Sequence, residues 1–246
     1  MEQANLALLE QGLRQFGLAP SGAALTAIVR HLDMVAEWNR SVNLTAIKDE
    51  RDMVLKHVVD SAAALAVVDL KPGNRLIDVG TGAGFPGVTL KCLVPGIEVV
   101  LLESLGKRCK FLEAVGAEVL PLIGAAPESY QVVWSRAEDA GVKLEFREQF
   151  DVVVARAVAE LRVLAEYCLP FCRVGGEFLA MKGPAAQAEL ESSARAILVL
   201  GGEVTEVREV DLPEDAGSRT LIRIKKVRST ARTYPRKAGL PAKNPL

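Results

Sequence analysis

The glycine-rich segment from Asp78 to Gly87 is the part of the sequence whose residue types and spacing suit a small-molecule ligand. It reads Asp-Val-Gly-Thr-Gly-Ala-Gly-Phe-Pro-Gly and lies between an apolar run typical of a strand and a stretch typical of a helix. Glycines permit a sharp turn and let a ligand approach the backbone, and Gly82, Gly84 and Gly87 also satisfy the G-x-G-x-x-G spacing of dinucleotide sites. The structural alternative is a turn that only packs the helix on the strand.

Two carboxylates flank this loop. Asp78 precedes Gly80 at the end of the first predicted strand, where it can face a cationic amino acid group, whereas it would repel a pyrophosphate. Glu103 ends the next predicted strand, where it can accept hydrogen bonds from both hydroxyls of a ribose. Glu103 suits NAD equally well, so Asp78 is the residue that favours S-adenosylmethionine over a dinucleotide.

Short apolar runs alternate with helical periodicity after residues 71–74 and predict the elements that position the loop. Such runs, bounded by turn residues, suit a largely parallel sheet buried between helices. They span residues 76–79, 97–102, 131–134, 151–155, 177–181, 204–210 and 220–227. The last two are separated by a loop too short for a crossover helix, so we expect them to pair antiparallel. The predicted fold is α/β, a doubly wound, mostly parallel seven-stranded sheet with a C-terminal antiparallel hairpin, which is the Rossmann-like order of class I methyltransferases.

The two ends of the chain differ from this central part. Apolar residues at helical spacing predict a helical N-terminal segment over residues 1–70, followed by a cofactor-binding domain over residues 71–228. Residues 229–246 are predicted to be a basic tail with little structure of its own. From Ala216 onward the sequence has nine basic residues and no acid, while the rest has 21 basic and 31 acidic residues. Such a segment is either a tail exposed to solvent or a basic segment that binds phosphate groups through its charge. Composition does not decide between the two.

Composition also excludes several kinds of protein. No window is apolar for long enough to cross a bilayer, and the first residues lack the pattern of a secretory signal, so we expect a cytoplasmic protein without a membrane partner. The four cysteines are interpreted as buried thiols, because Cys168 and Cys172 have no neighbouring histidine that would complete a metal site. With two histidines in the whole chain, no metal is expected. We expect a monomer.

Many short blocks of sequence, in one order and nearly from end to end, match a known family. They include residues 38–40, 78–87, 104–108, 136–138, 155–157, 181–183 and 234–239. In these blocks the chain resembles the RsmG/GidB family (glucose-inhibited division protein B), the bacterial 16S ribosomal RNA guanine-N7 methyltransferases. The stretch between Phe111 and Ser135 departs from the family pattern.

The resemblance implies a cofactor site for S-adenosylmethionine and a basic cluster beside it. The loop and the resemblance together predict as cofactor-binding residues Asp78, Gly80, Gly82, Gly84, Phe85, Ala137, Glu138 and Arg156, with Glu103 on the ribose. The basic cluster would surround the cofactor and the target nucleotide, and it consists of Lys107, Arg136, Arg156 and Lys182.

Guanine N7 has an in-plane lone pair and no proton, so we expect no general base, and the basic cluster would act by positioning and electrostatics. We predict that Arg136 or Arg156 donates to O6 or to a flanking phosphate, which leaves N7 free. An ion pair with a protein carboxylate is the structural alternative for each.

Two other functions remain open from the sequence alone. An NAD-dependent oxidoreductase is supported by the glycine spacing, but the chain lacks a paired Tyr and Lys and a histidine suited to hydride chemistry. A noncatalytic RNA-binding ribosome assembly factor on the same fold is the other alternative. For an RNA-directed function the expected partner is small-subunit ribosomal RNA or a 30S ribosomal particle.

Overall fold

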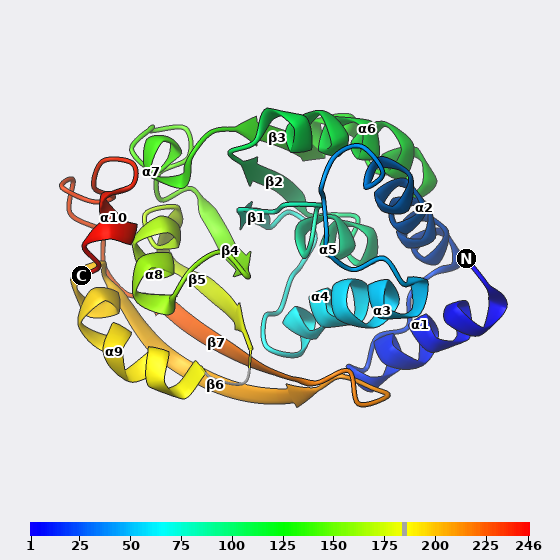
Figure 1. Cartoon of the computed structure of the whole chain (residues 1–246). Coiled ribbons are helices and arrows are strands. Elements are labelled where there is room, and N and C mark those ends of the chain that lie inside the picture. The colour runs from blue at the N-terminus through cyan, green and yellow to red at the C-terminus, as the bar shows by residue number, and fades with distance from the viewer. Residues whose placement is uncertain (184–185) are drawn as a thin grey trace.

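Seven strands form one sheet in the computed structural model, which describes residues 1–183 and 186–246 (Figure 1). The strand order is β3-β2-β1-β4-β5-β7-β6. Neighbours are parallel from β3 to β5, and β7 is antiparallel to both β5 and β6. The strands are β1 (Arg75–Val79), β2 (Glu98–Glu103), β3 (Tyr130–Trp134), β4 (Phe150–Arg156), β5 (Cys172–Lys182), β6 (Gly202–Asp211) and β7 (Ser218–Lys226). The mostly parallel sheet and its C-terminal hairpin confirm the predicted fold class.

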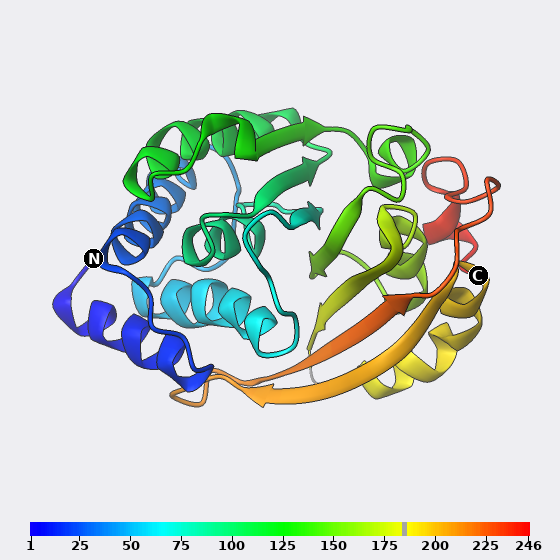
Figure 2. The same ribbon diagram turned by 180° about the vertical axis from the view of Figure 1, so that it is seen from behind.

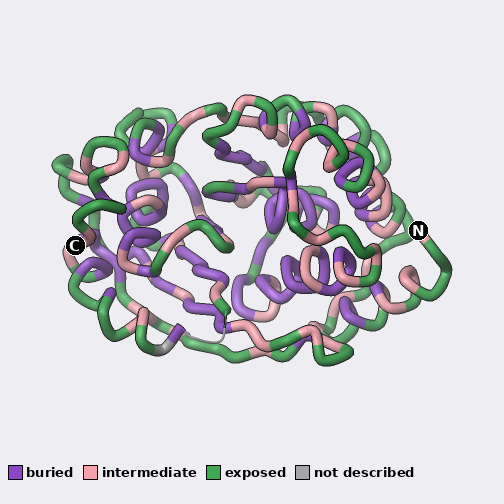
Figure 3. Tube along the Cα trace, in the orientation of Figure 1, coloured by how far each residue is buried: buried purple, intermediate pink, exposed green. Residues whose placement is uncertain are grey.

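Helices cover both faces of the sheet (Figure 1, Figure 2). One face carries α5 (Gly87–Leu93) and α6 (Gly106–Leu122), and the other carries α7 (Ala137–Ala140), α8 (Leu161–Cys168) and α9 (Ala186–Val199). Because successive side chains of a strand point to opposite faces, Leu76 belongs to the first core and Ile77 to the second. The strands at the centre are therefore buried on both sides, as Figure 3 shows.

The N-terminal segment is helical, as predicted, and packs on the α5 and α6 side of the sheet. Its elements are α1 (Gln3–Gln15), α2 (Gly22–Trp38), α3 (Glu50–Met53), a π-helical turn η1 (Val54–Val59), α4 (Asp60–Ala62) and a 3₁₀ turn η2 (Ala63–Ala66). Ser21 caps α2 by accepting a hydrogen bond from the main-chain N–H of Ala24. The buried side chains Ile28, Leu32 and Val35 lie on one face of α2, which contacts α5 and α6.

The C-terminal segment packs on the body of the protein beside α7 and α8 (red in Figure 1). Its one short helix is α10 (Leu240–Lys243); a 3₁₀ turn, η3 (Pro127–Ser129), precedes β3. Arg147 donates to the carbonyl oxygens of Thr230 at 2.7 Å and Tyr234 at 2.8 Å. This segment has little regular secondary structure, and its path is fixed mainly by side-chain contacts with the rest of the protein.

Candidate functional site

The glycine loop lies where β1 ends and α5 begins, at the carboxyl edge of the parallel strands. Gly80, Gly82 and Gly84 have φ of 74°, 61° and 91°, in the left-handed region that other residues adopt only with strain. A Cβ on Gly80 would lie 2.8 Å from Val158 Cγ2, whereas a Cβ on Gly82 would meet no atom within 4 Å. The loop therefore needs glycine for its shape, and it presents open space beside the backbone of Gly82.

Asp78 lies fully buried beneath the loop. Its Oδ2 accepts hydrogen bonds from Thr81 Oγ1 at 2.6 Å and from the N–H of Gly87 at 2.8 Å. Burial raises the pKa of Asp78 to about 6, because a low-dielectric environment penalises the charged carboxylate. Oδ2 thus fixes the two ends of the loop, while among the described residues Oδ1 has no hydrogen-bond partner, and the contact of Asp78 with the amino acid group of a ligand stays a prediction.

Glu103 joins the glycine loop to the turn after β2. Its Oε1 accepts hydrogen bonds from the N–H groups of Ser104 at 2.7 Å and Leu105 at 2.8 Å, and its Oε2 accepts one from Gly82 N at 3.1 Å. The side chain is 4% exposed, and Arg108 Nη1 lies 3.7 Å from Oε2. Glu103 thus lies beside the open face of Gly82, where the sequence predicts a ribose, and the contact with a ribose stays a prediction.

A cavity of about 160 Å³ opens beside Gly80 and contains several of the predicted cofactor residues. Its lining consists of Val79, Gly80, Leu102, Ser104, Ser135, Arg136, Ala137, Glu138, Val158 and Tyr167. Common ligand pockets measure about 300–1,000 Å³, so a cofactor would extend from this cavity over the open face of Gly82. Bare backbone, the carboxylate of Glu103 and an apolar wall are what an adenosine with a charged amino acid group requires, so these residues fit S-adenosylmethionine.

Phe85 lies behind the loop, within the first core. Its ring stacks on His57, with the ring centres 4.7 Å apart, and lies 4.6 Å from the ring of His31. Phe85 is 5% exposed and does not line the cavity beside Gly80, so it supports the loop from below. His31 in turn lies with Nε2 2.7 Å from the carbonyl oxygen of Ala83, which links α2 to the loop.

His57 has a structural role in the N-terminal segment. Its Nε2 lies 2.8 Å from Thr45 Oγ1, so it joins two parts of the N-terminal segment. Burial, followed by the charge of Arg156, lowers the pKa of His57 to about 3, which keeps the imidazole neutral at neutral pH.

The four predicted basic residues divide into two groups. Arg136 lines the cavity beside Gly80, and Lys107 is exposed in the first turn of α6. Arg156 and Lys182 line a second cavity of about 340 Å³ on the other side of residues 157–158. Its remaining lining is Lys56, His57, Asp60, Ala157, Met181, Gly183, Glu189 and Arg219. The expected single cluster is therefore corrected to two adjoining basic regions.

Arg156 and Lys182 are both paired with carboxylates. Arg156 Nη1 lies 3.0 Å from Asp60 Oδ2, and Lys182 Nζ lies 2.8 Å from Glu189 Oε2. Their side chains are 12% and 11% exposed. For these two residues the structure has the ion pair that was the alternative to a substrate contact, whereas Arg136 is exposed.

Several residues at the cavities were not singled out from the sequence, among them Val158, Tyr167 and Arg219. Val158 follows the block 155–157 directly, so an extension of that block by one residue would have found it. Tyr167 comes from α8 and Arg219 from β7, and no local pattern in the sequence marks either of them. Ala157, with φ of 56°, is the left-handed residue that turns the chain between the two cavities.

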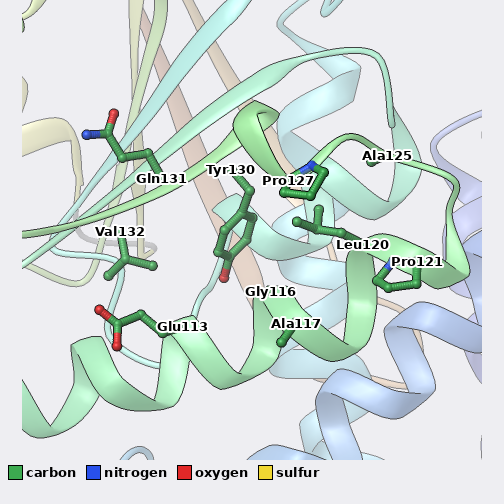
Figure 4. A pocket seen from close by; sticks show the side chains of 10 residues that line it. All are labelled: Glu113, Gly116, Ala117, Leu120, Pro121, Ala125, Pro127, Tyr130, Gln131 and Val132. Atoms are coloured by element: carbon green, nitrogen blue, oxygen red, sulfur yellow. The ribbon is translucent and has the colours of Figure 1, made fainter.

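A third cavity, of about 420 Å³, lies between α6 and the start of β3 (Figure 4). Its lining is mostly apolar, with the ring of Tyr130 over Gly116 and one carboxylate, Glu113. It falls in the stretch between Phe111 and Ser135, and none of the predicted site residues lines it. The candidate site is therefore at the two cavities beside the glycine loop.

The four cysteines are free and buried, as predicted. Among the described residues, no helix is long and apolar enough to cross a membrane. The same residues contain no group of three or more His, Cys, Asp or Glu side chains placed to hold a metal ion.

Comparison with known proteins identifies the family. A family model described as rRNA small subunit methyltransferase G matches residues 24–221. The chain belongs to this family. The ribosomal RNA small subunit methyltransferase G of Symbiobacterium thermophilum is 57% identical, and the match covers 97% of this chain and 97% of that protein. The protein of the same name from Alkaliphilus oremlandii is 46% identical over 97% of this chain and 98% of that protein.

Solved structures with low sequence identity show the fold alone. The fibrillarin pre-rRNA processing protein of Methanococcus jannaschii has a TM-score of 0.51 at 16% identity, over 68% of this chain and 74% of that protein. The branched-chain polyamine synthase of Thermus thermophilus has a TM-score of 0.56 at 16% identity, over 82% of this chain and 64% of that protein. Membership of the methyltransferase G family confirms the predicted activity, S-adenosylmethionine-dependent methylation of guanine N7 in 16S ribosomal RNA, and decides against an NAD-dependent oxidoreductase.

Proposed function

We propose that this chain carries out the family reaction with the cofactor bound from the open face of Gly82 to the cavity beside Ala137 and Glu138. The observation that supports this placement is the convergence of Gly80, Gly82 and Glu103 at one edge of the sheet, next to that cavity. Parallel α/β sheets bind ligands at the carboxyl ends of their strands, which is where these residues lie.

The reaction makes modest chemical demands on the protein. When bound, S-adenosylmethionine supplies an electrophilic sulfonium methyl group. No side chain needs to remove a proton, because N7 carries none, so the protein contributes mainly by holding the guanine in line. Arg136, which is exposed at the rim of the cavity, is free to donate to O6 or to a phosphate, and exposed Lys107 can add positive charge nearby.

The second cavity is assigned to the target guanine. Its volume of about 340 Å³ falls within the range of small-molecule pockets, and residues 157–158 separate it from the cofactor cavity. Arg156 and Arg219 line its floor through their shared partner Asp60, while Lys56 adds a cation from the N-terminal segment. In this arrangement Arg156 and Lys182 shape the cavity, and their ion pairs keep their side chains in place.

We also propose that the protein acts in the cytoplasm as a monomer on ribosomal RNA, either free or within a 30S particle. In this proposal residues 1–70 form a wall of the RNA site and residues 71–228 form the cofactor domain. Residues 229–246 form a segment that supports the cofactor domain. The packing of α2 on α5 and α6 supports the first of these roles.

The test is transfer of radiolabelled methyl groups from S-adenosylmethionine to unmethylated small ribosomal subunits and, separately, to their naked RNA, followed by nucleoside analysis. Label in 7-methylguanosine is the expected result, and the better substrate shows which form is recognised. Absence of label from both, with intact cofactor binding, would contradict the proposal and favour the noncatalytic assembly factor.

A further inference from the structure

Trp134 is a large aromatic side chain that is 72% exposed at the margin of the cofactor site. It is the last residue of β3 and pairs in register with Glu103 of β2. Tryptophan is mostly buried in folded proteins. An indole with this exposure next to a binding site therefore indicates a surface that a binding partner covers.

The structure holds the indole of Trp134 in a fixed orientation. Its Nε1 donates a hydrogen bond to the carbonyl oxygen of Ser104 at 3.0 Å. The ring also lies against the start of α6, where a Cβ on Gly106 would be 3.0 Å from Cζ2 of the indole. Glycine at that position lets the ring rest on bare backbone. The indole of Trp134 is therefore held in place by Ser104 and Gly106, and its remaining surface faces solvent.

The exposed charges in the two segments that adjoin this indole are of one sign. In the segments 104–111 and 134–138, the exposed charged side chains are Lys107, Lys110 and Arg136, and all are basic. Glu103 and Glu138 are buried and hydrogen-bonded to main-chain N–H groups, whereas Glu113 and Asp139, which follow these two segments, are exposed. An exposed aromatic ring among cations suits a polyanion that carries flat, unpaired rings.

We propose that Trp134 is a stacking platform for an unpaired base of the RNA substrate, on the far side of the cofactor cavity from the cavity assigned to the guanine. Lys107, Lys110 and Arg136 would contact the phosphates on either side of the stacked base. The inference rests on the proposed function for its RNA substrate, and it adds a binding site outside both cavities. A protein partner could also cover an exposed indole, but three cations around it favour RNA.

Fluorescence tests the stacking directly, because Trp38 and Trp134 are the only tryptophans in the sequence. In a Trp38→Phe variant, single-stranded RNA of about eight nucleotides should quench the emission of Trp134, since a stacked base quenches indole. An abasic strand of equal length should bind through its phosphates without that quenching. Equal emission with both strands, while fluorescence anisotropy of labelled strands shows saturation, would overturn the proposal.

Kinetics on small ribosomal subunits give an independent readout. Trp134→Ala should raise KM for the subunit about 5- to 150-fold, the equivalent of about 1–3 kcal/mol of stacking, and leave the Kd for S-adenosylmethionine unchanged. Trp134→Phe should recover most of that loss, because a phenyl ring still stacks. The matched control is Leu144→Ala, which removes another exposed apolar side chain, 85% exposed and outside both segments.

An unchanged KM in Trp134→Ala would overturn the proposal and leave a protein partner as the occupant of the indole. Failure of the stacking proposal can be distinguished from failure of the proposed function. If the unaltered protein methylates no ribosomal RNA, the proposed function fails, while quenching by RNA and not by the abasic strand would still support the stacking platform.

Discussion

Arg156 donates from Nη1 to Asp60 Oδ2 at 3.0 Å, and this pair joins the end of β4 to the N-terminal helical segment. Arg219 Nε of β7 lies 3.0 Å from the same oxygen, and Asp60 is 3% exposed. The guanidinium of Arg156 also lies 5.7 Å above the ring of Phe85, beneath the glycine loop. One buried carboxylate thus connects three parts of the chain around the proposed guanine cavity.

Arg156→Ala should therefore reduce both folding stability and activity. Removal of one partner from a buried ion pair costs about 3–5 kcal/mol, and the remaining Arg219 should keep the loss toward the lower end. The measurement is urea-induced unfolding together with methyl transfer. Arg173→Ala is the control, because its pair with Asp151 is half exposed and should contribute less than about 1 kcal/mol. If Arg156→Ala loses turnover but keeps full stability, Arg156 acts directly on the substrate and the structural explanation is wrong.

Gly82→Asp should abolish cofactor binding. The side chain would enter the open space beside the loop and place a second carboxylate next to Glu103, whose Oε2 is 3.1 Å from Gly82 N. We expect a loss of affinity of at least about 100-fold, measured by calorimetry with S-adenosylmethionine. Gly82→Ala separates charge from conformation, because it adds only left-handed strain of about 1–2 kcal/mol. Normal binding by Gly82→Asp would refute the assignment of the loop.

Stability should fall at acid pH through His31. Burial lowers its pKa to about 4, against about 6.5 in the unfolded chain, so folding favours the neutral ring. The stability from this residue is fully present above pH 6.5 and is lost as pH falls toward 4; at pH 5 the loss is about 2 kcal/mol. His31→Gln keeps an N–H donor for the carbonyl of Ala83 but does not titrate. Its unfolding free energy relative to the unaltered protein should rise by about 2 kcal/mol between pH 8 and pH 5, and a constant difference would contradict this cause.

The parts of the site that sequence reasoning located are those set by local spacing. The glycine loop and Glu103 follow directly from strands with clear apolar runs, and the short loop between β6 and β7 predicts the hairpin. The hydrogen bonds that Asp78 Oδ2 accepts within the loop were not predicted, because they depend on where the N–H of Gly87 and the hydroxyl of Thr81 point after the turn. The pairing of Arg156 with Asp60 joins residues 96 positions apart, and no local pattern encodes it.

The C-terminal segment is a second feature that the sequence left undecided. The N–H of Gly239 donates to Glu138 Oε1 at 2.8 Å, and Glu138 lines the cofactor cavity. Arg236 is held nearby through Glu166, which is 1% exposed, with Nη2 and Oε2 at 2.6 Å. The segment is thus joined to α7 and α8, and one of its cations, Arg236, is paired with a buried carboxylate of the protein.

Arg236→Ala should weaken binding of S-adenosylmethionine as well as stability, because it leaves Glu166 buried without its partner and releases the segment that holds Glu138. We expect a loss of about 3–5 kcal/mol in unfolding free energy and a rise in the cofactor Kd, measured by urea unfolding and calorimetry. Addition of Glu166→Gln should recover part of the stability, since no unpaired charge then remains buried. Lys237→Ala removes the neighbouring exposed cation and should leave the cofactor Kd unaltered. If Arg236→Ala and Lys237→Ala both affect only RNA affinity, the segment is an electrostatic handle for phosphates, with no part in holding α7.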